Sequence, residues 1–119
     1  MKLRIGLGMV LVAGVLLAGC GRSAGHVKGV APKGEPRAIL SVHSGDAPTL
    51  VTVRGKMIEK CPTAGCWFRV HDDTGVVKVD TKSAGFVVTD LSLGTEITVA
   101  GKIGHDGDET IIEATGIRY

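Results

Sequence analysis

The sequence predicts an all-β fold, a small barrel of five strands, and two observations support this. From residue 49 onward, apolar and polar side chains alternate with a period of two, as expected for strands with one buried face. The alternating segments are separated by short connections rich in Gly, Asp and Pro, which favour turns. With 119 residues, the chain has room for one domain.

The first strand is expected at residues 50–60, where Val51, Val53 and Met57 share one face. Gly55, in the middle of this strand, predicts a bulge or a sharp bend. The remaining strands are expected at residues 66–72, 76–81, 95–103 and 109–119, with turns at 73–75 and 104–108 and an irregular stretch at 82–94 that could hold a helical turn. This order of strands matches an OB-fold-like Greek-key barrel, and another small barrel or sandwich is the alternative.

The N-terminus has the features of a targeting segment. Lys2 and Arg4 precede an apolar run at residues 5–18, which is too short to span a membrane comfortably. The run ends in Leu17-Ala18-Gly19-Cys20, which resembles the lipobox of bacterial lipoproteins. The resemblance implies cleavage before Cys20, lipid attachment to its sulfur, and a domain held outside the cytoplasm at a membrane of the cell envelope. An ordinary signal peptide or an uncleaved anchor is the alternative reading.

Residues 20–48 are rich in Gly and Pro and are expected to form the lipidated cysteine and a flexible tether. Within them, only residues 38–42 are apolar enough for a short strand. The predicted organisation is therefore a signal peptide at 1–19, a tether at 20–48 and the barrel at 49–119.

The charge balance argues against a nucleic-acid partner. The chain has 14 Lys and Arg side chains against 12 Asp and Glu, but Lys2 and Arg4 lie in the targeting segment, which leaves 12 of each sign. Binding to nucleic acid depends on clustered positive charge that neutralises phosphates.

If Cys20 carries lipid, Cys61 and Cys66 remain as a pair between the first two predicted strands. In an oxidising compartment they are expected to form a disulfide, worth about 2 kcal/mol for so short a loop. The alternatives are a thiol-redox pair, or a copper or zinc site with His71 as a further ligand. Strand alternation opposes the metal site, because Cys66 and His71 would point to opposite faces. No cofactor is therefore expected.

The second and third predicted strands present a candidate ligand-binding face. Trp67, Arg69 and His71 share the outer side of one strand, and Lys78 is expected beside them on the next. Such side chains could stack on a planar ligand or hold an oligosaccharide or an acidic peptide. In the alternative, Trp67 covers the barrel end or packs on the tether.

Residues 53–103 resemble small extracytoplasmic OB-fold domains of bacteria whose function is uncharacterised. The resemblance is carried by Gly65-Cys66-Trp67-Phe68, by Phe86-Val87-Val88 and by the segment 94–101, which begins and ends with Gly. It supports the fold and implies no particular chemistry.

No Ser/His/Asp arrangement, paired carboxylates or phosphate-binding loop is evident, so the chain is not expected to be an enzyme. His26, His43 and His105 are scattered and expected to be solvated. The predicted function is a lipid-anchored binding module for an envelope protein or a small ligand; metal or thiol-redox handling by Cys61 and Cys66 is the alternative.

Overall fold

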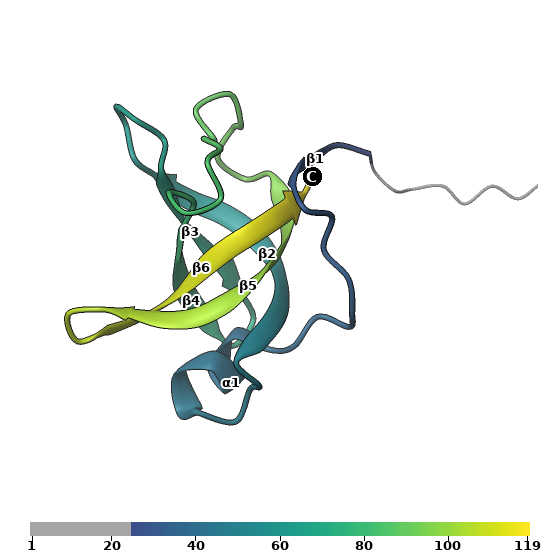
Figure 1. Ribbon diagram of the computed structural model, residues 1–119, viewed down its shortest axis with the longest axis vertical. Coiled ribbons are helices and arrows are strands. Elements are labelled where there is room, and N and C mark those ends of the chain that lie inside the picture. The colour runs from purple at the N-terminus through teal and green to yellow at the C-terminus, as the bar shows by residue number, and fades with distance from the viewer. Residues whose placement is uncertain (1–24) are drawn as a thin grey trace, which may run out of the picture.

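The computed structural model describes residues 25–119, which form a closed barrel of five strands with one short strand added at an edge (Figure 1). Around the barrel the order is β2–β3–β4–β6–β5, and β5 pairs with β2 to close it. All neighbours are antiparallel except β4 and β6. The strands are β2 (Leu50–Lys60), β3 (Trp67–Asp72), β4 (Gly75–Asp80), β5 (Glu96–Asp106) and β6 (Glu109–Arg118). The predicted OB-fold-like barrel is confirmed.

The core follows the alternation of the sequence. Val51, Val53 and Met57 of β2 are buried as predicted, and β3 alternates the buried Phe68 and Val70 with outward side chains. Apart from Phe68, the fully buried large side chains in the described part of the chain are aliphatic: Ile39, Met57, Ile97, Ile112, Ile117, Val53, Val70, Val77, Val79, Val88 and Val99. A barrel this small is closed by branched aliphatic side chains that pack densely without aromatic bulk.

Gly55 marks a close approach of backbones, and the bulge lies further along the strand. A Cβ atom at Gly55 would be 2.3 Å from the carbonyl oxygen of His71 on β3. The register shift between β2 and β3 falls between Met57 and Glu59, so Ile58 is the extra residue. The bulge sets Glu59 opposite Arg69, and so determines one of the ion pairs described below.

The structure corrects the tether predicted for residues 20–48, of which it describes 25–48. Strand β1 (Val27–Gly29) pairs with β6, and helix α1 (Ile39–Ser44) takes the place of the short strand predicted at 38–42. Ile39 and Val42, three positions apart, are both buried against the barrel. A six-residue helix is not stable alone, so tertiary packing, which local sequence does not report, decides its conformation.

Asp72 holds the start of α1 against the β3–β4 turn. Its carboxylate accepts hydrogen bonds from the backbone N–H groups of Ile39 (2.9 Å), Thr74 (2.7 Å) and Gly75 (3.1 Å). Burial opposes the charge of Asp72, but the hydrogen bond from the Thr74 hydroxyl group, together with those from the three N–H groups, outweighs it and lowers the pKa of the carboxyl group. The helix lies at one end of the barrel in Figure 1.

The opposite end is covered by the irregular segment 82–94, drawn in green in Figure 1. The N–H of Gly85 donates to the carbonyl of Thr81, which confirms the predicted helical turn, and Val88 and Leu91 are buried. The N–H of Val88 donates to the carbonyl of Gly65 at 2.9 Å, so this segment supports the cysteine-containing loop 61–66.

The predicted signal peptide, the lipobox and Cys20 lie outside the described residues. Between residues 25 and 119, no helix has the length and apolar character needed to cross a membrane.

Candidate ligand-binding face and cysteine loop

The outer side of β3 and β4 carries the side chains that the alternation of these strands predicts. Trp67 and Arg69 are half-buried beside the buried Phe68, and Lys78 and Asp80 alternate with the core residues of β4. Trp67 pairs with Asp80 across the two strands, and Arg69 with Lys78. We call the surface made by Trp67, Arg69 and Lys78 the Trp67 face.

Both cations of the Trp67 face contact its aromatic ring. The guanidinium carbon of Arg69 lies 5.7 Å from the Trp67 ring centroid, and Nζ of Lys78 lies 5.1 Å from it. Cations at such distances are attracted by the negative face of the ring. The indole remains half-exposed.

Carboxylates surround the Trp67 face, and this is the feature that the sequence did not reveal. Arg69 pairs with Glu59 at 3.1 Å and with Glu109 at 2.6 Å, while Lys78 pairs with Asp106 at 3.3 Å. The hydrogen bond that Arg69 donates to the Glu109 carboxylate is the largest cause that raises the pKa of Arg69. The surface is therefore balanced in charge rather than basic. Asp106 and Glu109 flank a turn that strand alternation could not place near β3, because only closure of the barrel brings them together.

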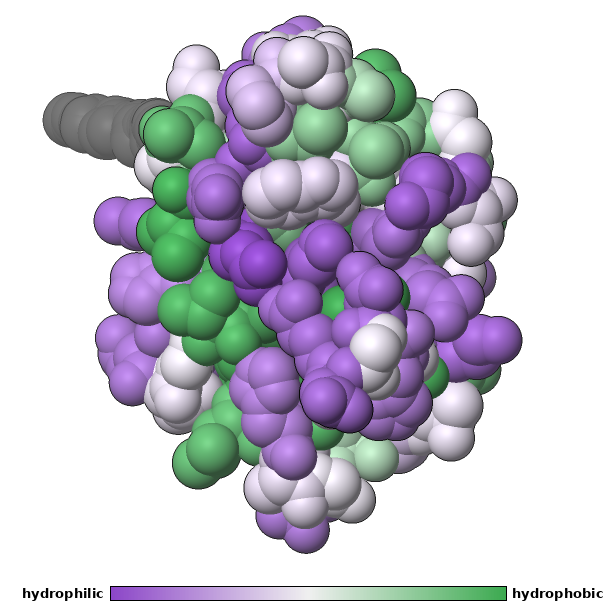
Figure 2. All heavy atoms as spheres, turned by 90° about the vertical axis from the view of Figure 1, so that its left-hand side faces the viewer, coloured by the Kyte–Doolittle hydropathy of each residue, from purple (hydrophilic) through white to green (hydrophobic). Residues whose placement is uncertain are grey.

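Figure 2 shows the side of the molecule from which the turn at 106–109 projects in Figure 1. Hydrophilic side chains cover most of its centre, and apolar ones gather along one edge.

His71 does not join the Trp67 face. It lies four residues after Trp67, about 13 Å along the strand, and is exposed. There it lines a shallow pocket of about 320 Å³ with Arg54, Gly55, Lys56, Asp72, Asp73 and Glu96. The predicted group of four residues is thus split between the two ends of β3.

Cys61 and Cys66 are both half-buried free thiols, so the predicted disulfide is not formed in the structure. The N–H of Cys61 donates to the carbonyl of Trp67 at 3.0 Å, which closes the neck of the loop beside the Trp67 face. The sulfur of Cys61 is turned into the loop, where it lies 3.6 Å from Oγ1 of Thr63.

The loop stabilises the thiolate form of Cys61. A hydrogen bond from the Thr63 side chain, followed by those from the backbone N–H groups of Thr63, Ala64 and Gly65, lowers the pKa of Cys61 from 9.0 to about 6. Donors that converge on a sulfur favour its negative charge. Gly65 allows this geometry through a positive φ of 64°.

The alternative metal site is not assembled. Within the described residues 25–119, no three His, Cys, Asp or Glu side chains are placed to hold one ion. Cys61 and Cys66 lie in the loop between β2 and β3, whereas His71 lies near the far end of β3.

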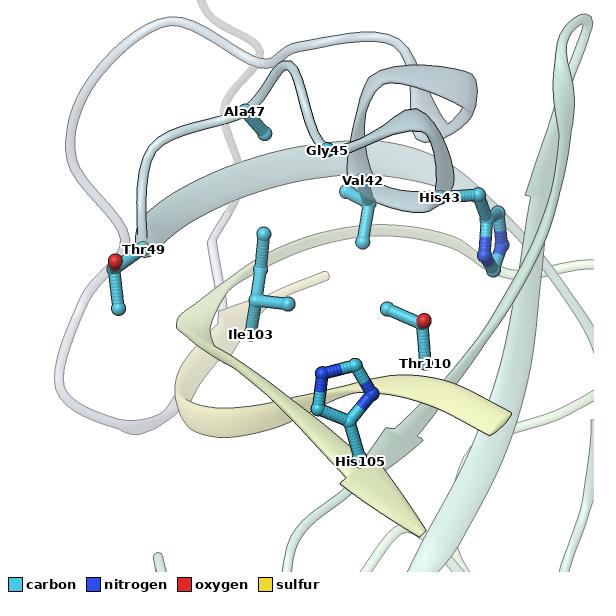
Figure 3. A pocket seen from close by; sticks show the side chains of 8 residues that line it. All are labelled: Val42, His43, Gly45, Ala47, Thr49, Ile103, His105 and Thr110. Atoms are coloured by element: carbon cyan, nitrogen blue, oxygen red, sulfur yellow. The ribbon is translucent and has the colours of Figure 1, made fainter. Parts of the chain in front are cut away.

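A second pocket, of about 270 Å³, opens between α1 and the β5–β6 hairpin. Figure 3 shows His43 and His105 on two sides of it, with Thr110 between them. Both histidines are exposed, in agreement with the prediction for them. Nε2 of His43 donates to the carbonyl of Val76 at 2.6 Å, so this ring ties α1 to β4.

No protein-family model matches the chain, and no curated protein matches it. Among solved structures, the chain is similar to the hypothetical protein ygiW from E. coli, with a TM-score of 0.55 and 19% sequence identity. The match covers 75% of this chain and 95% of that one. At this identity the similarity establishes the OB-fold-like barrel and nothing more specific.

Proposed function

We propose that this protein is a lipid-anchored module of the bacterial cell envelope that binds an oligosaccharide on the Trp67 face. The observation that carries the proposal is the half-exposed indole held by two cations on the strand pair where OB-folds take their ligands. The adjoining loops, 61–66 and 106–109, correspond to the two loops that such barrels add to their ligand sites.

The charges of the face favour a neutral ligand over an oligonucleotide, the other ligand class of OB-folds. A phosphate chain lying on Trp67 would approach Glu59, Asp106 and Glu109, and the cations it needs already pair with these carboxylates. Sugar hydroxyl groups both donate and accept hydrogen bonds, so they can use the cations and the carboxylates together. The apolar surface of the indole provides a flat support for a sugar ring.

Because Trp67 is the only tryptophan in the chain, its fluorescence reports directly on this face. We expect a neutral soluble oligosaccharide, tested as cellohexaose, maltohexaose and chitohexaose, to change the emission of the purified protein. Calorimetry should show that Trp67→Ala weakens binding about tenfold or more, as expected for a central aromatic anchor.

His71→Ala is the matched control, because His71 lies on the outer side of the same strand but away from the Trp67 face. It should leave the affinity unchanged. The proposal fails if single-stranded oligothymidylate binds more tightly than every oligosaccharide, if none of the probes binds, or if Trp67→Ala binds as well as the natural protein.

The lipid anchor makes a separate prediction. Two or three acyl chains hold a protein durably on a bilayer, at about 0.8 kcal/mol per buried methylene. Cys20→Ser should therefore move the protein from the membrane fraction to the soluble fraction and abolish incorporation of labelled palmitate. Cys61→Ser should leave both unchanged. Palmitate labelling that persists in Cys20→Ser would rule out the lipobox.

A further inference from the structure

We propose that Cys61 and Cys66 form a thiol–disulfide exchange pair, in which Cys61 attacks a disulfide of a partner molecule and Cys66 completes the exchange. The loop that holds them is a separate functional site from the Trp67 face, although the two adjoin. This activity does not depend on the oligosaccharide proposal.

The contacts of Cys61 assign it the attacking role. Cys61 is a free thiol whose sulfur lies 3.6 Å from Oγ1 of Thr63, and the backbone N–H groups of Thr63, Ala64 and Gly65 further lower its pKa. This arrangement favours the thiolate, which is the reactive form of cysteine in exchange reactions. Docking of the loop onto segment 82–94, through the Val88 N–H to Gly65 carbonyl bond, keeps the donors in place.

Cys66 is suited to the second step because it stands in the same loop and is also a half-buried free thiol. The two lysines near the loop already have other partners. Lys82 forms an ion pair with Asp80 at 3.2 Å, and Lys60 donates a hydrogen bond to the carbonyl of Thr89 at 3.0 Å. The low pKa of Cys61 therefore has its causes within the loop.

The reaction balances without a cofactor. The Cys61 thiolate attacks one sulfur of the partner disulfide, a new S–S bond forms, and the other sulfur leaves as a thiolate with the bonding electrons. Cys66 then loses its proton to solvent and attacks the Cys61 sulfur, which releases the second partner thiolate. The two loop thiols are oxidised to one disulfide, and the partner disulfide is reduced to two thiols.

In this exchange reaction, the disulfide that the sequence predicts between Cys61 and Cys66 is the oxidised state of the pair and not a permanent link. Forming it removes the negative charge that Thr63 and the loop N–H groups stabilise in the reduced state. Interactions that stabilise the reduced form make a disulfide a stronger oxidant.

The test is the reaction of the reduced full-length protein with dithiodipyridine, a small disulfide whose released thione absorbs light. In Cys66→Ser the rate for Cys61 should follow a titration with a midpoint at about pH 6. The lower pKa raises the thiolate fraction but reduces its nucleophilicity. Compared with the same variant in denaturant, Cys61 should react about twentyfold faster at pH 6 and about fourfold faster at pH 7.

Product analysis by mass spectrometry tests the role of Cys66. The natural protein should release one thione more than either single-cysteine variant and end with an internal disulfide, whereas Cys66→Ser should retain the probe as a stable mixed disulfide. Differences between variants cancel any contribution of Cys20.

Thr63→Ala should shift the midpoint for Cys61 upward while the internal disulfide still forms. A midpoint near 9 for Cys61 in the folded protein, or a natural protein that ends with two bound probes, would overturn the proposal.

Discussion

Gly55→Ala is expected to destabilise the barrel by about 3 kcal/mol or more, which is a large part of the stability of a small domain. The added Cβ would lie 2.3 Å from the carbonyl oxygen of His71 and 2.7 Å from its carbon. At this point β2 pairs with strands on both sides: its pairing with β5 runs as far as Lys56, where its pairing with β3 begins opposite His71. The clash is with backbone, so it can be relieved only by separating β2 from β3.

Denaturant unfolding, followed by far-UV circular dichroism, measures this loss. Gly75→Ala is the control, because a Cβ there would meet nothing closer than 3.7 Å, the distance to Cγ2 of Ile39. We expect that substitution to cost less than about 1 kcal/mol. If the two variants unfold at the same denaturant concentration, the close approach of the backbones at Gly55 does not affect the free energy of unfolding.

The barrel could be predicted from the sequence because the alternation of side chains and the turn residues are features of short segments of the chain. In β2, β3 and β4 a single period of two decides which side chains face the core, and Gly and Asp mark the turns between strands. Gly55 could be recognised as a special position of β2. The bulge at Ile58 could not be located, because the register of β2 depends on its partner strand.

The order of the N-terminal segment could not be predicted, for the opposite reason. Glycine and proline dominate its composition, and this matches a flexible chain. Its order comes from contacts with residues far along the chain: β1 pairs with β6, the hydroxyl of Thr52 donates to the carbonyl of Lys33, and α1 rests on the β3–β4 turn. No pattern within residues 25–48 reports these contacts.

The candidate sites could also be predicted only where they depend on the alternation within one strand and not on contacts between distant segments. Alternation placed Trp67, Arg69 and Lys78 on one face correctly. It could not show that Glu59, Asp106 and Glu109 neutralise that face, because they come from a bulged strand and a distant hairpin. The direction of the Cys61 sulfur depends on the conformation of loop 61–66, which spacing alone does not determine.

Ile39→Ala is expected to destabilise the protein by about 2–5 kcal/mol, the usual cost of truncating a fully buried Ile. Ile39 has no exposed surface and belongs to the main core together with Val42. Its backbone N–H also donates to Asp72, and that of Leu40 donates to Oγ1 of Thr74, so the first turn of the helix is held by polar contacts as well as by the apolar one. A helix this short has no stability of its own that could compensate for a lost core contact.

Leu40→Ala is the matched control, since Leu40 is the next residue of α1 and is 56% exposed. It should change the unfolding free energy by less than about 0.5 kcal/mol. Hydrogen exchange should then show fast opening of residues 39–44 in Ile39→Ala and slow opening in Leu40→Ala. Equal stabilities for the two variants would mean that α1 does not contribute to the core, and the segment would then be the tether that its composition predicts.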